Sequence, residues 1–191
     1  MKGIKVLKRL LEINKPFYTI SDLEKITGIK RESLYVTLNR WVDMKILERI
    51  GKGLYVPFGR EILIEKIASQ LYFPNYLSFE YALARYGVLN LIPYTLTFAT
   101  PRKTRRYTVA GRDIEFRQIK RELFWGFIKE AGIYIAKREK AFLDQVYLFK
   151  KGMASIDMDE LNIDLLSKRL LFEYVERYPP FVKRFLISHL E

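Results

Sequence analysis

The chain has 191 residues, no cysteine and one histidine, His189. These counts exclude a disulfide scaffold, a thiol nucleophile and a zinc site of the usual Cys type, and they argue against multi-His metal sites and His-based triads. The formal net charge is +12, from 34 Lys and Arg against 22 Asp and Glu. Such a basic balance favours a polyanionic partner, most simply nucleic acid, although a charge that only promotes solubility is the alternative.

The excess positive charge is unevenly distributed along the chain. Residues 1–60 hold 13 basic and 6 acidic side chains, residues 61–150 hold 15 and 9, and residues 151–191 hold 6 and 7. The opening segment is charged throughout and no stretch approaches about 20 uncharged apolar residues, so neither a signal peptide nor a membrane span is predicted. We therefore expect a cytoplasmic protein without a membrane partner.

The first 60 residues carry start and stop signals for three helices. Apolar spacing predicts a helix over 2–14, which ends before Pro16. Ser21, with Glu24 three residues later, matches a capping box and would open a short second helix that stops at Gly28. Residues 30–44 then read as a longer third helix. This succession is typical of a helix-turn-helix.

The third predicted helix has one apolar face and one polar face. Leu34, Leu38 and Trp41 share the apolar face, so the opposite face would be presented to solvent or to a DNA major groove. An arginine can hydrogen-bond to guanine and an asparagine to adenine, whereas a tyrosine or serine can hydrogen-bond to phosphate. The candidate DNA contacts on this helix are Arg31, Ser33, Tyr35, Asn39 and Arg40.

A β-hairpin is predicted directly after the third helix. Residues 46–50 and 54–57 form its strands, and the Gly-Lys-Gly turn between them supplies the positive φ angles that a tight turn needs. Lys52 at the tip and Arg49 beside it would contact phosphate or a minor groove. Residues 1–59 therefore predict a winged-helix DNA-binding domain. A merely solvated face, or a winged helix that binds protein, is the alternative.

The rest of the chain predicts a mixed α+β domain over 60–150 and a helical C-terminal extension over 151–191. Ser78 is placed as the cap of one helix of the α+β domain. The predicted helices are 61–71, 79–86, 138–149, 163–178 and 181–190, and the predicted strands are 94–100, 105–109, 114–119 and 133–135.

Three segments of this second part resemble the AbiEi family of antitoxins. They are Tyr-Leu-Ser-Phe-Glu-Tyr-Ala-Leu-Ala-Arg-Tyr-Gly at 76–87, Thr-Leu-Thr-Phe-Ala-Thr at 95–100, and Ile-Ala-Lys-Arg-Glu-Lys-Ala-Phe-Leu-Asp at 135–144. The resemblance implies a transcriptional regulator of a type IV toxin–antitoxin system that binds an operator in duplex DNA and represses its own operon. It also implies a functional pairing with a nucleotidyltransferase-like toxin, without requiring physical contact. A homodimer is left open.

A dense basic run follows the predicted strand 94–100. Its members, Arg102, Lys103, Arg105 and Arg106, would add a second surface for phosphate contacts if they lie on a hairpin. The alternative is a charged solvent edge that discourages pairing between strand edges.

No enzyme is predicted. A nuclease of the restriction type needs a lysine after its carboxylates, but Arg117 stands in that place after Asp113 and Glu115. Lys140 and Asp144 are interpreted as an i,i+4 ion pair on an exposed helix face instead of a catalytic pair. We expect no catalytic residue, metal or cofactor.

Overall fold

The computed structural model describes residues 3–190 and has an α+β fold. The chain divides into two compact units, one comprising residues up to Ile67 with Thr108–Gly111, the other Ala68–Tyr107 and the residues from Arg112 onward. The described residues form eight α-helices, two short 3-10 helices, one three-stranded sheet and one six-stranded sheet.

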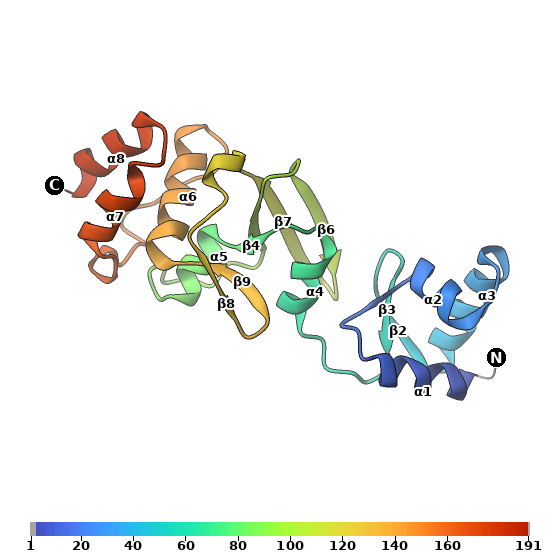
Figure 1. Ribbon diagram of the computed structural model, residues 1–191. Coiled ribbons are helices and arrows are strands. Elements are labelled where there is room, and N and C mark those ends of the chain that lie inside the picture. The colour runs from blue at the N-terminus through green and yellow to red at the C-terminus, as the bar shows by residue number, and fades with distance from the viewer. Residues whose placement is uncertain (1–2, 191) are drawn as a thin grey trace. The chain divides into compact units, whose positions relative to one another are not determined.

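The first unit has the predicted order of three helices followed by a hairpin (Figure 1). Its elements are α1 (Gly3–Ile13), β1 (Tyr18–Thr19), α2 (Ile20–Thr27), α3 (Arg31–Asp43), β2 (Leu47–Gly51) and β3 (Leu54–Pro57). Strand β3 pairs antiparallel with both β2 and β1, in the order β1-β3-β2. Strand β1 was not predicted, because two residues carry too little pattern to be recognised.

The cap of α2 differs from the prediction. Thr19 is the N-cap, and its Oγ1 accepts a hydrogen bond from the backbone N of Asp22 at 3.1 Å. The Asp22 carboxylate in turn accepts one from the backbone N of Thr19 at 2.9 Å, which completes a capping box. The expectation for Ser21 and Glu24 was therefore wrong, because the helix begins at Ile20 and places Ser21 inside its first turn.

The three helices and the sheet of the first unit enclose one apolar core. Its buried members are Val6, Leu10, Tyr18, Leu23, Leu34, Leu38, Trp41, Leu47 and Tyr55. The Tyr18 hydroxyl donates to the carbonyl of Leu10 at 2.5 Å, so this buried polar group is satisfied within the core. Each helix and both hairpin strands contribute to this core, which fixes the orientation of α3.

The second unit is built on a mixed sheet with the strand order β6-β7-β5-β4-β9-β8. The strands are β4 (Tyr76–Leu77), β5 (Leu96–Thr100), β6 (Arg105–Val109), β7 (Arg112–Gln118), β8 (Phe127–Glu130) and β9 (Ile133–Ala136). Strands β5 and β7 are parallel, as are β4 and β9, whereas β4 and β5 are antiparallel. Two strands were not predicted: β4 is very short, and β8 pairs antiparallel with β9 at an edge of the sheet.

The helices of the second unit surround α6, which packs against α5, α7 and α8 (Figure 1). These helices are α5 (Phe79–Arg85), α6 (Arg138–Lys150), α7 (Lys168–Val175) and α8 (Pro180–Leu190). The expected helix over 163–178 was wrong, because Ile163–Leu165 forms a 3-10 turn and Ser167 then caps α7. The helix α4 (Ile64–Leu71) begins three residues later than expected.

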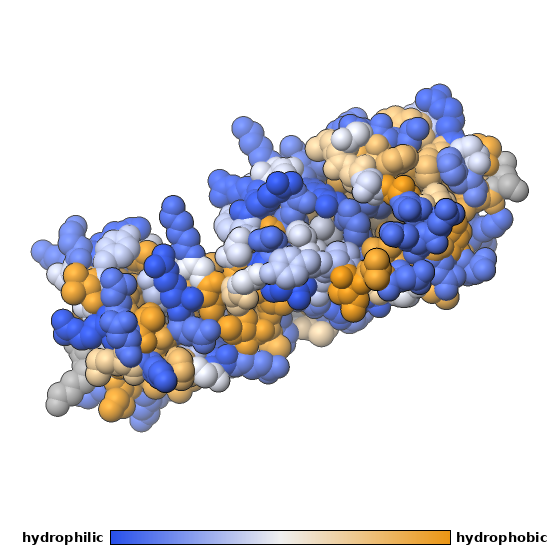
Figure 2. Space-filling view, turned by 180° about the vertical axis from the view of Figure 1, so that it is seen from behind, coloured by the Kyte–Doolittle hydropathy of each residue, from blue (hydrophilic) through white to orange (hydrophobic). Residues whose placement is uncertain are grey.

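Exposed apolar side chains occur as separate groups among hydrophilic residues on the face drawn in Figure 2. In α1, Ile4 and Leu11 are exposed, whereas Val6 and Leu10 are buried. Within residues 3–190, no helix is long and apolar enough to span a membrane.

Candidate nucleic-acid interface

All five residues predicted as DNA contacts on the third helix are exposed on α3. Arg31, Ser33, Tyr35, Asn39 and Arg40 lie outside the core. The opposite side of the helix is buried, since Leu34 and Leu38 have no exposed surface and Trp41 has 4%. The helix thus presents a polar face with two arginines, an amide and a phenol, held in place by the apolar residues behind it.

The first turn of α3 also organises its exposed side chains. A hydrogen bond with the Tyr35 side chain raises the pKa of Arg31, which places these two residues together one turn apart. The Thr37 hydroxyl donates to the backbone carbonyl of Ser33 at 2.9 Å, so Thr37 is engaged within the helix. The helix begins just after Gly28, which adopts a left-handed conformation with φ of 71° and ends α2.

The hairpin places Lys52 at its tip, exposed to solvent. Arg49 is exposed on β2, and its Nε donates to the carbonyl of Gly51 at 3.4 Å, so this side chain folds back along the turn. The register shifts between Arg49 and Gly51, and Gly53 has a φ of 70°, which together form the tight end of the hairpin. Both predicted hairpin residues therefore belong to the same unit as α3.

The predicted basic run lies in the second unit, and its four cationic side chains have different surroundings. Arg106 forms an ion pair with Glu115, whose Oε1 accepts a hydrogen bond from Nε at 2.8 Å and lies 2.7 Å from Nη2. Lys103 is exposed. The Arg102 guanidinium lies 4.2 Å from the centroid of the Tyr72 ring, and the Arg105 guanidinium 5.1 Å from the same centroid. Tyr72 was missed at the level of sequence, because it lies thirty residues before the run.

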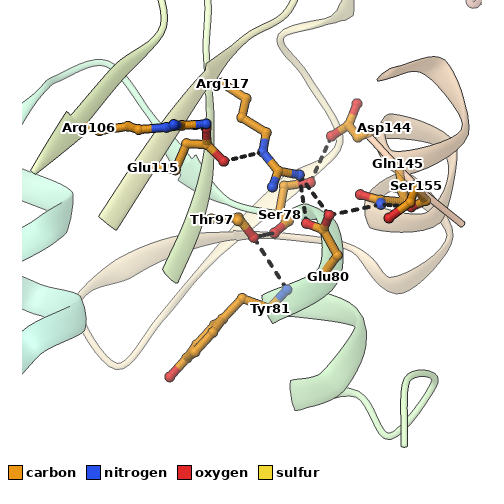
Figure 3. A network of polar contacts seen from close by, with 10 residues as sticks. All are labelled: Ser78, Glu80, Tyr81, Thr97, Arg106, Glu115, Arg117, Asp144, Gln145 and Ser155. Carbon is orange, nitrogen blue, oxygen red and sulfur yellow. Dashed lines mark hydrogen bonds and ion pairs between the residues drawn. The ribbon is translucent and has the colours of Figure 1, made fainter. Parts of the chain in front are cut away.

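Glu115 is a structural carboxylate between two arginines (Figure 3). Its Oε2 accepts a hydrogen bond from Nε of Arg117 at 2.7 Å, and Arg117 Nη1 continues to both oxygens of Glu80 at 2.7 and 2.8 Å. Burial raises the pKa of Glu115, but the hydrogen bonds from Arg117 and Arg106 outweigh that effect and leave the pKa below its ordinary value. The carboxylate is therefore committed to these two arginines.

The described residues contain no group of three or more His, Asp or Glu side chains placed to hold a metal ion. Arg117, which occupies the position of a nuclease lysine, is bound to Glu80 and Glu115.

The interpretation of Lys140 and Asp144 as an exposed pair was wrong. Both side chains are fully buried, and Lys140 Nζ is paired with Asp144 Oδ1 inside the second unit. The Asp144 carboxylate also accepts from the hydroxyls of Tyr178 at 2.8 Å, Tyr76 at 2.9 Å and Ser78 at 2.9 Å. Ser78 occupies the N-cap position of α5, but it makes no side-chain cap bond because its hydroxyl is directed to Asp144.

Aromatic rings surround the buried ammonium group. Lys140 Nζ lies 5.1 Å from the ring centroid of Tyr178, 5.3 Å from that of Trp125 and 5.5 Å from that of Tyr76. Burial lowers the pKa of Lys140 although Asp144 lies beside it, and burial raises the pKa of both Tyr76 and Tyr178 well above the ordinary value. Lys140 and Asp144 are thus enclosed within the second unit.

No protein-family model matches the chain, and no curated protein matches it.

Proposed function

We propose that the chain is a sequence-specific transcription regulator that binds duplex DNA with its first unit in the manner of a winged helix. The observation that carries this proposal is the exposed face of α3. It combines Arg31, Asn39 and Arg40 with the phenol of Tyr35 on a helix whose other side is buried in the core. These groups match the base edges and phosphates of a major groove.

The hairpin and the overall charge support the same proposal. Lys52 stands exposed at the end of a two-stranded hairpin that follows α3 directly, which is where a wing contacts the phosphate backbone. The first 60 residues carry 13 basic side chains against 6 acidic ones. A helix that reads bases and a hairpin that contacts phosphates have different roles, and their substitution should have different effects.

The resemblance of residues 76–87, 95–100 and 135–144 to the AbiEi family extends the proposal to a biological role. In this role the chain acts in the cytoplasm as the autoregulating antitoxin of a type IV toxin–antitoxin pair. Its DNA partner is the operator of its own operon, and its functional partner is a nucleotidyltransferase-like toxin. Repression of a reporter by the chain, and rescue of growth from the product of the neighbouring gene, would test this role.

The DNA-binding proposal predicts distinct results for base-reading and phosphate-contacting residues. Asn39→Ala or Arg40→Ala should lower the preference for operator over scrambled duplex by about tenfold, since a good base contact contributes about 1–3 kcal/mol of discrimination. Lys52→Ala should weaken both duplexes alike. Lys8→Ala, which removes one exposed charge from α1, is the control and should change neither. Unchanged preference in both α3 variants would contradict the proposal.

A protein-binding winged helix is the competing function. Val36 and Tyr35, which are 63% and 45% exposed on the same face of α3, give it some basis. If the wild-type chain binds no duplex at low salt, this competing function replaces the first.

A further inference from the structure

The arginines around Tyr72 form a second charged surface, distinct from α3 and located in the second unit. Arg102 donates from Nη1 to the carbonyl of Phe73 at 2.9 Å, and its guanidinium lies against the Tyr72 ring. Arg105 donates from Nη1 to the Tyr107 hydroxyl at 3.3 Å and lies near the same ring. Both guanidiniums are therefore held in defined positions, although both residues are exposed.

Aromatic contacts fix the ring that holds them. Tyr72 is 5% exposed, and it meets Phe116 of β7 edge-on with a centroid distance of 5.4 Å. Tyr107, which accepts the hydrogen bond from Arg105, meets the same Phe116 ring with a centroid distance of 5.8 Å. The two arginines are thus attached to the packed sheet through their aromatic partners.

The positive charge of this pair is not compensated by the protein. Among residues 3–190, neither Arg102 nor Arg105 has an ion-pair partner, and each uses one guanidinium nitrogen in a hydrogen bond to a neutral oxygen. Two guanidiniums that lie near the same ring raise the local positive potential, which favours an anion there. Arg106, the next residue, differs because Glu115 neutralises it. Arg105 and Arg106 are therefore sequence neighbours that differ in one respect: Arg106 has an acidic partner and Arg105 has none among the described residues.

We propose that Arg102 and Arg105 form a clamp for a phosphate group of a nucleic-acid backbone. Guanidinium donors suit phosphate because they bind it with two parallel N–H groups, and the aromatic contacts limit the side-chain freedom lost on binding. Exposed Lys103, between the two arginines in the sequence, adds positive charge to the clamp. The clamp rests on the proposed function, since it supplies sequence-independent contacts to DNA that α3 reads.

The proposal distinguishes this clamp from a diffuse basic surface. Arg105→Ala should weaken binding to a scrambled duplex about tenfold, and the Arg102→Ala, Arg105→Ala double variant should lower the slope of log affinity against log salt by about one, as expected for one lost phosphate. Arg106→Ala removes the same formal charge one residue away, and it should leave affinity within about twofold of wild type. Arg105→Lys keeps the charge but loses the planar fork, and it should behave as Arg105→Ala.

The measurement is fluorescence anisotropy of the full chain with a scrambled duplex over several salt concentrations, with a thermal melt of each variant to establish folding. Equal losses for Arg105→Ala and Arg106→Ala would overturn the clamp in favour of general charge, as would an Arg105→Lys variant that binds like wild type. Unchanged binding in all variants would also overturn it. If inorganic phosphate raises the melting temperature of wild type but not of the double variant, and duplex binding is unaltered, the ligand is free phosphate and the nucleic-acid assignment is wrong.

The two proposals fail in different ways. The α3 variants should lose the preference for operator over scrambled duplex, whereas the Arg102 and Arg105 variants should lose affinity for both duplexes and show a lower salt slope. If the wild-type chain binds scrambled DNA through Arg105 but shows no operator preference, the sequence-specific part of the proposed function is contradicted, whereas the clamp, which needs only DNA binding, is supported.

Discussion

At the scale of single residues, the least expected feature is a buried ion pair that is completed by hydroxyl groups. Asp144 accepts hydrogen bonds from Lys140, Tyr76, Ser78 and Tyr178, which come from α6, β4, the start of α5 and the segment after α7. A buried charge is tolerated when such partners satisfy it. The pair therefore links the C-terminal segment to the sheet, and its removal should affect stability more than surface charge does.

Lys140→Met should lower the free energy of unfolding by about 3–5 kcal/mol, because Asp144 would remain buried without its cation. Arg169→Ala removes one partner of the pair Arg169–Glu173, which has the same i,i+4 spacing but is exposed, and it should have little effect. Urea unfolding followed by circular dichroism measures both. Similar small losses in the two variants would show that the buried pair contributes no more than a surface one.

The lowered pKa of Glu115 predicts that the stability of the folded chain depends on pH in the acid range. Its pKa in the folded chain lies below the ordinary value of 4.5, so its contribution is present above that value and is lost as the pH falls through the folded pKa. The melting temperature of wild type should therefore fall as the pH is lowered from 5 towards 3, and Glu115→Gln should remove part of that fall. If the melting temperatures of wild type and Glu115→Gln fall by the same amount over this pH range, the attribution of the pH dependence to Glu115 is wrong.

At the scale of elements, the position of α3 depends on the local structure that precedes it. The capping box of Thr19 and Asp22 opens α2, Gly28 ends it in a left-handed conformation, and the buried residues of α3 then hold that helix against the core. An additional ion pair between Lys15 and Asp22, at 2.6 Å, supports the cap. Changes at the cap should therefore lower stability without altering the exposed face of α3.

The two candidate caps of α2 can be separated by substitution. Thr19→Ala should lower the free energy of unfolding by about 1 kcal/mol, because it leaves a backbone N–H at the helix start without an acceptor. Ser21→Ala should have almost no effect, since Ser21 is exposed in the first turn. Thermal unfolding of the two variants measures the difference. A larger loss for Ser21→Ala would contradict the observed cap.

Elements with strong local signals could be predicted, whereas those that depend on distant partners could not. Gly28 and the Gly-Lys-Gly turn at 51–53 mark their helix end and hairpin without reference to the rest of the chain. By contrast, β4 is defined by its pairing with β5 and β9, and its two residues carry no periodicity of their own. The face assigned to Lys140 was wrong for the same reason, because Tyr178 and Tyr76 that enclose it are far away in sequence.

The candidate interface follows the same division. The exposed face of α3 could be predicted, because helical spacing alone separates Leu34 and Leu38 from the polar residues. The basic run at 102–106 could be predicted, but the difference in surroundings between its arginines could not. Arg106 is neutralised by Glu115 of β7, and Arg105 lies against Tyr72, which precedes the sheet. Neither partner is close to the run in sequence.

At the scale of the whole molecule, the two units have different roles in the proposed function. The first carries α3 and the hairpin, which would read sequence and contact the adjacent backbone. The second carries the exposed arginines around Tyr72 and the enclosed Lys140–Asp144 cluster. The net charge of +12 is consistent with contacts to a polyanion from either unit.

The most direct test of the central claim compares the purified chain's binding to the DNA upstream of its own gene with its binding to a scrambled duplex. Fluorescence anisotropy at a low and a moderate salt concentration measures both affinities. We predict tighter binding to the upstream DNA, and a steep loss of affinity for both duplexes as salt rises, because phosphate contacts release counterions. Equal affinities for the two duplexes, or no binding at either salt concentration, would contradict a sequence-specific DNA-binding role.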